Sequence, residues 1–310
     1  MAQLKGMKTL TDNRWLPYLQ ILLACLIWGS YGLFVRLLPY PAEVIVFFRF
    51  LFGGLFLVGL AAATGNLSQV KPSTHWKTMV LISIINSTSW LALSRAIKYT
   101  SVANGFILYY TAPCFVVMLA PLLLKERLEK KSLAALGFCF VGIVVTMGFS
   151  ELGRGEHAFQ GNLLGLSSGL TYALYVLGLK RIPASSLGLN SNIYLCGVIS
   201  LISFPLALPA ISQVTLSGLL VLIALGLSIQ TTATTVYMVG LRKVKAQHAS
   251  ILSYSEALFA VLLSMAFLHE SITLNVVIGG LLIFAGGVII VSRKGKAEKV
   301  SEEEAPVGLT

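Results

Sequence analysis

One acidic side chain falls near the middle of a long apolar stretch of this sequence. It is Glu256, which lies within the stretch 249–268. A carboxyl group that is removed from water can exchange protons near neutral pH, so Glu256 is the candidate for a proton-coupling site. The alternative is a structural role, in which the carboxyl group stays protonated or bonds to a neighbouring hydroxyl group.

Amide, hydroxyl and aromatic side chains gather near the middle of other apolar stretches. In 77–97, Ser83, Asn86, Ser87, Trp90 and Ser94 recur at spacings of three and four, and therefore share one helical face. Polar groups in a bilayer usually face a wet cavity, although Ser and Thr also bond to their own backbone or to a neighbouring helix. We expect a bound solute to contact Trp28, Asn86, Trp90, Tyr110, Tyr172, Gln230, Thr234 and Tyr254.

Four further residues are candidates for gating or structural roles. Arg49 lies about 9 Å into the stretch 43–63, where it could extend to the membrane surface or bind an anionic group of the solute. Pro113 removes a backbone hydrogen bond within 103–124, which predicts a kink or a hinge. Glu126 and Glu270 lie just after 103–124 and 249–268 and are expected to be charges at helix ends. Trp28, beside Gly29, could equally serve helix packing.

An internal repeat organises these residues. A shift of 144 residues pairs Trp28 with Tyr172, since 172 − 28 = 144, without any gap. The same shift also pairs Arg36 with Lys180, Asn86 with Gln230, Tyr110 with Tyr254, Glu126 with Glu270, and Gly142 with Gly286. Each half contains five apolar stretches. Two copies of an odd-numbered bundle must cross a membrane in opposite orientations, as in carriers that bind solute near the midplane.

The composition agrees with a membrane protein. Of the 310 residues, 56% are hydrophobic and 11% are charged, against roughly 25% charged residues in soluble domains. We predict an all-α integral membrane protein with ten transmembrane helices in two inverted five-helix repeats. The helices are expected at 16–37, 43–63, 77–97, 103–124, 132–149, 161–179, 190–210, 216–240, 249–268 and 273–292. A cytoplasmic segment (1–15) precedes the first repeat (16–149), and a disordered cytoplasmic tail (293–310) follows the second (161–292).

The distribution of positive charge predicts the orientation. Most of the 23 lysines and arginines lie in connections on the side of the N-terminus, while Arg95, Lys98 and Arg154 lie in connections on the other side. Cytoplasmic loops carry the excess of Lys and Arg. We therefore expect a multi-pass protein of the cell (inner or plasma) membrane with both termini in the cytoplasm.

The chain resembles the EamA-type permeases of the drug/metabolite transporter superfamily from Trp15 to about Arg293. The residues that carry the resemblance are Trp28-Gly29, Phe48-Arg49, Thr100-Ser101-Val102-Ala103, Pro113, Leu124-Lys125-Glu126, Lys245-Ala246-Gln247-His248-Ala249, Tyr254-Ser255-Glu256-Ala257 and Leu268-His269-Glu270. Family members often have proline where this chain has Ala257, which puts a second kink in doubt. The resemblance implies ten helices in two inverted halves and an alternating-access permease, in many cases an exporter, for an amino acid or related metabolite.

Other classes of function find less support in the sequence. No motif of a membrane enzyme is present, and the scattered cysteines and histidines predict neither a metal site nor a cofactor. The basic residues are confined to short connections, which argues against nucleic acid as a partner. A passive channel or facilitator and a non-transport membrane protein remain as alternatives. The expected partners are a small-molecule substrate, the lipid bilayer, and protons or a counter-transported solute; the chain is expected to be a monomer or a homodimer.

Overall fold

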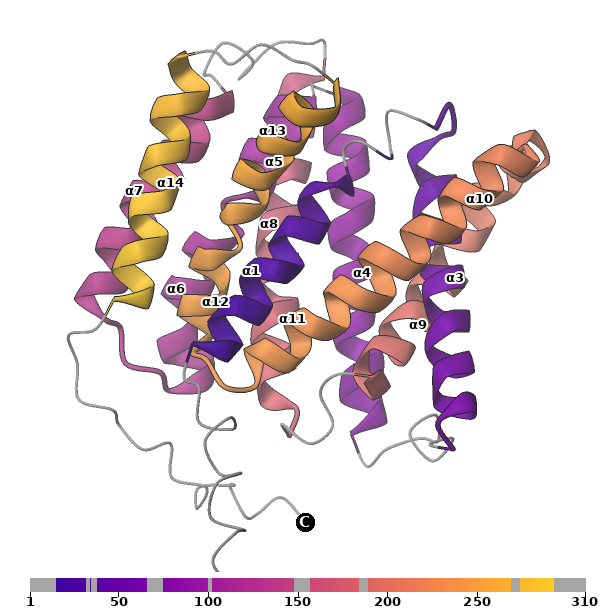
Figure 1. Cartoon of the computed structure of the whole chain (residues 1–310), viewed down its shortest axis with the longest axis horizontal. Helices are drawn as coiled ribbons and strands as arrows, with labels where there is room; N and C mark the ends of the chain where they lie inside the picture. Colours follow the sequence, from indigo (N-terminus) through magenta and orange to yellow (C-terminus); the bar gives the residue numbers. More distant parts are fainter. Residues whose placement is uncertain are drawn as a thin grey trace, which may run out of the picture.

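The computed structural model describes residues 15–31, 34, 38–65, 75–99, 102–147, 157–183, 189–268 and 274–292. The described segments are helical, without strands (Figure 1). The helices of the first half are α1 (Leu16–Gly29), α3 (Ala42–Ala63), α4 (Trp76–Tyr99), α5 (Val102–Tyr109), α6 (Ala112–Leu124) and α7 (Lys130–Met147). Those of the second half are α8 (Ala158–Arg181), α9 (Leu189–Ala207), the 3-10 helix η3 (Leu208–Gln213), α10 (Leu216–Leu225), the π-helix η4 (Gly226–Ala233), α11 (Thr234–Leu241), α12 (Ala246–Leu252), α13 (Ser255–Leu268) and α14 (Leu274–Val291). Glu270, the tail 293–310 and most of the segment 1–15 lie outside the described residues.

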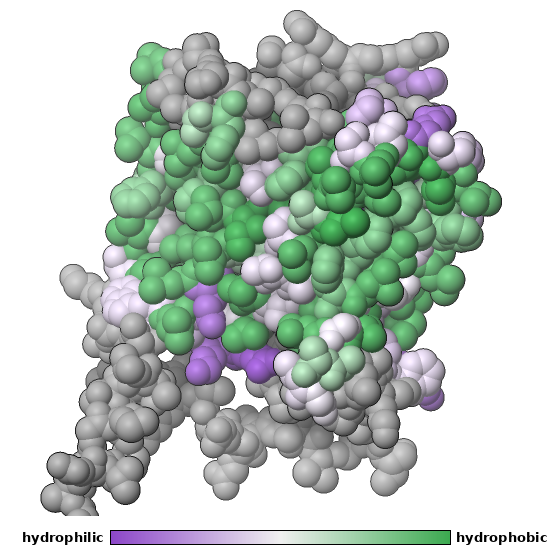
Figure 2. Space-filling view, turned by 45° about the vertical axis from the view of Figure 1, so that its right-hand side comes forward, coloured by the Kyte–Doolittle hydropathy of each residue, from purple (hydrophilic) through white to green (hydrophobic). Residues whose placement is uncertain are grey.

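Within the described residues, six helical segments are long and apolar enough to cross a membrane. They are Ala42–Ala63, Trp76–Ala96, Gly105–Leu124, Ala158–Arg181, Leu189–Gln213 and Leu216–Leu241. Shorter apolar helices cover Leu16–Gly29 and Val277–Val291. Large apolar side chains such as Phe159 and Leu122 are exposed by 82% and 76%, and hydrophobic residues cover most of the face in Figure 2. Such a surface is stable against lipid rather than water, so the chain is a multi-pass membrane protein.

The stretch around Pro113 is broken, as the sequence predicts. α5 ends at Tyr109 and α6 begins at Ala112, which places Pro113 in the first turn of α6. Proline is tolerated there because the N–H groups of the first turn have no acceptor within the helix, so its missing N–H breaks no hydrogen bond. A second break separates α12 from α13 and contains no proline. The expectation that Ala257, in place of proline, would leave this stretch without a kink was therefore wrong. The two breaks meet, since the Tyr254 hydroxyl donates to the Tyr110 carbonyl at 2.8 Å.

The π-helix η4 distinguishes the second half from the first. Its hydroxyl groups bond five residues back: Thr231 Oγ1 donates to the Gly226 carbonyl at 3.0 Å, and Thr234 Oγ1 to the Ile229 carbonyl at 3.2 Å. The corresponding helix α4 has regular bonds four residues back. η4 also packs closely on α3, because a Cβ on Gly226 would lie 2.8 Å from the Gly53 nitrogen. This crossing brings one turn of α3 against one turn of η4.

Helices α7 and α14 form a close antiparallel pair at one edge of the bundle (Figure 1). A Cβ on Gly142 would lie 2.7 Å from the Gly279 carbonyl oxygen, and one on Gly286 would lie 2.8 Å from that of Ala135. The later part of each helix therefore meets the earlier part of the other. Adding 144 to 142 and to 135 gives 286 and 279, so the two contacts are copies of each other. Reciprocal contacts of this kind are those of a two-fold axis.

Candidate functional site

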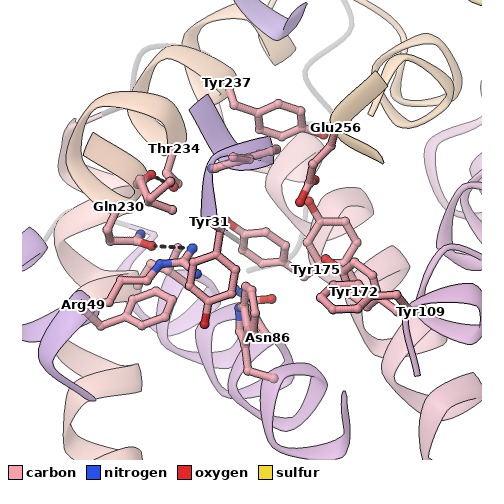
Figure 3. Close-up of a pocket in the computed structure, with 16 residues that line it drawn as sticks. Tyr31, Arg49, Asn86, Tyr109, Tyr172, Tyr175, Gln230, Thr234, Tyr237 and Glu256 are labelled. Atoms are coloured by element: carbon pink, nitrogen blue, oxygen red, sulfur yellow. Dashed lines mark hydrogen bonds between the residues drawn. The ribbon is translucent and has the colours of Figure 1, made fainter. Parts of the chain in front are cut away.

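A pocket lies in the interior of the helix bundle, between the two halves (Figure 3). Its cavity volume is about 50 Å³, below the roughly 300–1,000 Å³ of small-molecule sites, so an organic solute would require the walls to move apart. Its walls come from α1, α3, α4, α5, α8, α9, η4, α11 and α13. The lining residues are Trp28, Tyr31, Arg49, Phe50, Asn86, Trp90, Phe106, Tyr109, Tyr172, Tyr175, Leu195, Ile229, Gln230, Thr234, Tyr237 and Glu256.

The lining is organised by the internal repeat. Four pairs of lining residues are related by the shift of 144: Trp28 with Tyr172, Tyr31 with Tyr175, Asn86 with Gln230, and Trp90 with Thr234. A pocket that contains both members of such pairs straddles the axis that relates the halves. It therefore lies where a rearrangement of one half against the other would change access to it.

Arg49 supplies a buried positive charge at one end of the pocket. Its side chain is 4% exposed and points into the pocket rather than toward the membrane surface. The guanidinium carbon lies 4.8 Å from the ring centroid of Trp90 and 5.1 Å from that of Tyr31. Its Nη2 donates to Gln230 Oε1 at 3.3 Å. Among the described residues, no carboxylate forms a salt bridge with Arg49.

Gln230 is held in place by a second amide. Its Nε2 donates to Asn192 Oδ1 at 2.8 Å, and Asn192 Nδ2 donates back to the Gln230 carbonyl at 2.8 Å. Since Nε2 is used in this way, Oε1 faces Arg49 as an acceptor. The close crossing of α3 on η4 at Gly53 and Gly226 brings these groups together.

Glu256 lies at the other end of the pocket, in the first turn of α13 (Figure 3). A helix N-terminus favours a carboxylate, and the break before α13 leaves the side chain directed into the pocket. Glu256 and Arg49 act on each other electrostatically across the pocket, yet they form no direct ion pair. The two charges therefore stand at separate ends of one chamber.

Aromatic rings form the walls between these charges. The ring centroids of Tyr109 and Tyr172 are 5.1 Å apart, and those of Trp28 and Tyr237 are 4.9 Å apart. Such rings offer apolar contact area and can stabilise a cation over their faces. The walls therefore suit an organic solute better than a bare inorganic ion.

Four polar atoms of the lining have no hydrogen-bond partner among the described residues. They are Trp28 Nε1, Arg49 Nε, Asn86 Oδ1 and the Tyr237 hydroxyl, and all four are buried. Buried polar groups in proteins are nearly always hydrogen-bonded. A solute that offers both donors and acceptors would complete these groups.

Six of the eight residues expected to contact solute line the pocket: Trp28, Asn86, Trp90, Tyr172, Gln230 and Thr234. Tyr110 and Tyr254 instead join the two helix breaks beside it. Ser83, Ser87 and Ser94 were expected to share a helical face with Asn86 and Trp90. Their hydroxyl groups donate to carbonyls of their own helix, which is the structural role given as the alternative.

Several lining residues were not predicted from the sequence. Among them, Tyr31 and Tyr175 lie three positions after Trp28 and Tyr172, and Tyr237 lies three positions after Thr234. Helical spacing places these residues on the faces that had already been selected. The shift of 144 also pairs Tyr31 with Tyr175, so this signal was available in the sequence.

A second group of charges joins the two halves at the start of α12. Glu129, which precedes α7, accepts from Lys245 Nζ at 2.7 Å and pairs with His248 and Lys131 at 3.3 Å each. His248 Nδ1 in turn bonds to the Tyr18 hydroxyl at 3.1 Å. We call these five residues the Glu129 cluster. Partial burial opposes ionisation, but the bonds from Lys245 and His248 prevail and lower the pKa of Glu129 to about 2.

Glu126 lies beside the Glu129 cluster. Its Oε1 accepts from the Ala246 backbone N–H at 3.0 Å, at the start of α12. Gln247 Nε2 donates to the Arg127 carbonyl at 3.1 Å. The connection between α6 and α7 is thus bonded to the start of α12 at several points, and the two halves are held together at this end.

Comparison with known proteins identifies the family. The sequence model of the EamA-like transporter family matches the chain twice, over residues 15–148 and 159–292. The chain belongs to this family. Among the relatives of this EamA-like transporter, an uncharacterized transporter of Archaeoglobus fulgidus is 29% identical over 281 residues, covering 87% of this chain and 94% of the relative. An uncharacterized transporter of Clostridium kluyveri is 26% identical over 273 residues, covering 85% and 87%.

A solved crystal structure of a protein resembles this EamA-like transporter with a TM-score of 0.76. The match covers 88% of this chain and 95% of that chain at 19% sequence identity. At this identity the likeness concerns the fold alone. The family match and the named relatives make this chain a membrane transporter.

Proposed function

We propose that this EamA-like transporter is a secondary-active carrier of a small organic solute, such as an amino acid or a related metabolite. It works by alternating access around the pocket between its halves. The observation that carries this proposal is the lining by residue pairs that the shift of 144 relates. A site shared by two related halves can be exposed to either side by moving one half against the other.

The proposed topology is ten transmembrane helices in two inverted five-helix repeats, in the cell membrane and with both termini in the cytoplasm. The reciprocal contacts of α7 and α14 support the inversion, because helices related by an axis in the membrane plane run antiparallel. The breaks of α5–α6 and α12–α13, which contain Tyr110 and its repeat mate Tyr254, support the same repeat. The distribution of Lys and Arg supports the orientation.

Glu256 is the proposed site of proton coupling. It lines the pocket, so a proton and a solute would compete for, or share, one carboxyl group. Glu256→Gln is expected to fold but to abolish uptake driven by a pH gradient, while exchange of solute across the membrane persists. Glu43→Gln is the matched control, because Glu43 lies at the start of α3 and does not line the pocket. Unchanged proton-driven uptake in Glu256→Gln would remove this residue from the mechanism.

Transport is tested with purified protein in proteoliposomes. A carrier gives saturable uptake, and unlabelled solute inside the vesicles accelerates the entry of labelled solute. Flux that does not saturate and shows no such acceleration would favour the channel alternative. Trp90→Ala and Asn86→Ala are expected to weaken solute binding, while Trp76→Ala, on the exposed start of the same helix, is expected to leave it unchanged. If both pocket variants bind like the parent, the α4 face serves packing only.

A further inference from the structure

We propose that Arg49 selects solutes that carry a carboxylate and that the cationic group of the same solute lies toward Glu256. The substrate class is therefore a zwitterion with its two charges on either side of an apolar or aromatic body. This inference rests on the proposed carrier function and assigns the specificity of its pocket to two named side chains.

The positive charge of Arg49 has no countercharge in contact with it among the described residues. Its guanidinium group is buried, and the neighbours that contact it, Gln230, Tyr31, Phe50 and Trp90, are all neutral. Buried charges in proteins are normally paired, because the removal of one ion from water costs on the order of several kcal/mol. Aromatic faces and an amide oxygen offset only part of this cost. A carboxylate of the solute would supply the missing countercharge.

The N–H donors of Arg49 have a geometry that suits a carboxylate. A guanidinium group carries five N–H donors in a planar fork that matches a carboxylate in a bidentate fashion. Gln230 accepts from Nη2, while Nε is buried and has no partner within the described part of the chain. Tyr31 and Trp90 both contact the guanidinium group with their rings, and Asn192 fixes the amide of Gln230. The fork is therefore held in a defined position with donors unused, which is the condition for selective recognition.

Glu256 supplies a carboxyl group at the opposite end of the pocket. Glu256 has no described cation within salt-bridge distance, and the walls between it and Arg49 are aromatic. An amine alone would leave Arg49 unpaired, and a carboxylic acid alone would leave Glu256 unpaired whenever Glu256 has released its proton. A dianion would add negative charge near Glu256. Only a solute with one charge of each sign neutralises both ends.

The test begins with the unmodified protein in detergent. Each member of a series of ω-amino acids, whose ammonium and carboxylate groups stand at opposite ends of an apolar chain, is added. The melting temperature is measured, since a ligand of the folded state raises it. The amino acid that stabilises most is then compared, by calorimetric titration, with its primary amide and with its decarboxylated amine. We expect both analogues to bind roughly 100-fold more weakly, because each leaves a buried charge unpaired. Equal binding of acid and amide overturns the assignment, and so does the absence of stabilisation by any member of the series.

The second arm uses variants. Arg49→Gln is expected to bind the acid roughly 100-fold more weakly and to lose the preference for acid over amide, since the fork is gone. Arg95→Gln is the matched control, because Arg95 is exposed on α4 and does not line the pocket. Arg49→Gln that keeps the preference overturns the assignment. Should this variant not fold, the analogue series on the unmodified protein decides alone.

The outcome is separable from that of the carrier proposal. If a solute without a carboxylate shows saturable uptake and counterflow and binds as tightly as any amino acid, the carrier function stands and the role of Arg49 fails. If acid-selective binding is found but no solute is counter-transported, the specificity stands and the carrier function fails.

Discussion

Replacement of Glu129 by glutamine is the sharpest test of how the two halves are held together. The carboxylate of Glu129 bonds to Lys245 at 2.7 Å and to Lys131 and His248 at 3.3 Å. Lys245 and His248 belong to the second half and Glu129 to the first. Glutamine keeps the size of the side chain and removes its charge. The change in stability therefore reports the electrostatic contribution of the Glu129 cluster.

The magnitude follows from the pKa. A fall in the pKa of Glu129 from 4.5 to about 2 corresponds to about 3 kcal/mol at 1.36 kcal/mol per pH unit. The side chains of Glu129, Lys131 and Lys245 are 21%, 32% and 36% exposed, so solvent screens part of this energy. We expect Glu129→Gln to lose about 1–2 kcal/mol at pH 7. A sum of the two partly exposed pairs with Lys131 and Lys245, at about 0.2–1 kcal/mol each, gives a similar figure.

The dependence on pH has a fixed sign. Because the pKa of Glu129 is lower in the folded state, its stabilisation is fully present well above pH 4.5 and is lost as the pH falls toward 2. At pH 3 about half of the difference between the parent protein and Glu129→Gln should have disappeared.

The assay is unfolding in mixed micelles, with helicity followed during titration with a denaturing detergent at pH 7 and pH 3. Lys245→Met and the double variant complete a cycle, in which we expect a coupling of about 1 kcal/mol. Glu43→Gln, outside the Glu129 cluster, should lose at most about 0.3–1 kcal/mol, the contribution of a carboxylate in the first turn of α3, and should show no coupling to Lys245. A loss below about 0.3 kcal/mol at pH 7, or an equal loss at both pH values, would refute the electrostatic reasoning.

Two further predictions concern packing between the halves. Gly286→Ala should destabilise by about 1–3 kcal/mol in the same unfolding assay, because the added Cβ would meet Cys139 and the Ala135 carbonyl; Gly137→Ala, on the same helix as Cys139 but with nothing within 4 Å, should be neutral or slightly stabilising. A neutral Gly286→Ala would contradict the close contact of α7 and α14. Tyr254→Phe should cost about 0.5–1.5 kcal/mol, because it leaves a carbonyl at the helix break without its donor; a smaller loss would mean that another group supplies the bond.

Much of the helical layout could be predicted from the sequence because apolar length is a strong signal. The predicted stretch 43–63 corresponds to α3 (Ala42–Ala63), and 216–240 corresponds to the segment Leu216–Leu241. The predicted start of the stretch 249–268 was wrong. Ala246, Gln247 and His248 were expected in a connection, but they form the first turn of α12 and are buried. Polar residues at a helix end resemble a loop in sequence, and only contacts with a distant segment, here that of Glu126 and Glu129, reveal otherwise.

The pocket was only partly predictable, for a similar reason. Polarity in an apolar stretch identified Asn86 and Gln230, and both line the pocket. The orientation of Arg49 was left open, because a long side chain near a helix end can reach either water or the interior. The crossing of α3 on η4 decides that orientation, and nothing in the sequence of either helix indicates their closeness except Gly53 and Gly226.

The π-helical turn η4 has a consequence for the shape of the pocket. In the first half, Asn86 and Trp90 lie on a regular α-helix, whose pitch is fixed by its hydrogen bonds. In the second half, conversion of η4 to α-helix would turn α11 by about 100° and shift it by about 1.5 Å, which would move Thr234 relative to Gln230. The two walls of the pocket therefore differ in helical pitch, because Asn86 and Trp90 lie on an α-helix and Gln230 lies on a π-helix. Residues that the repeat pairs consequently stand at different relative positions on the two walls, and the pocket is asymmetric although its halves are copies.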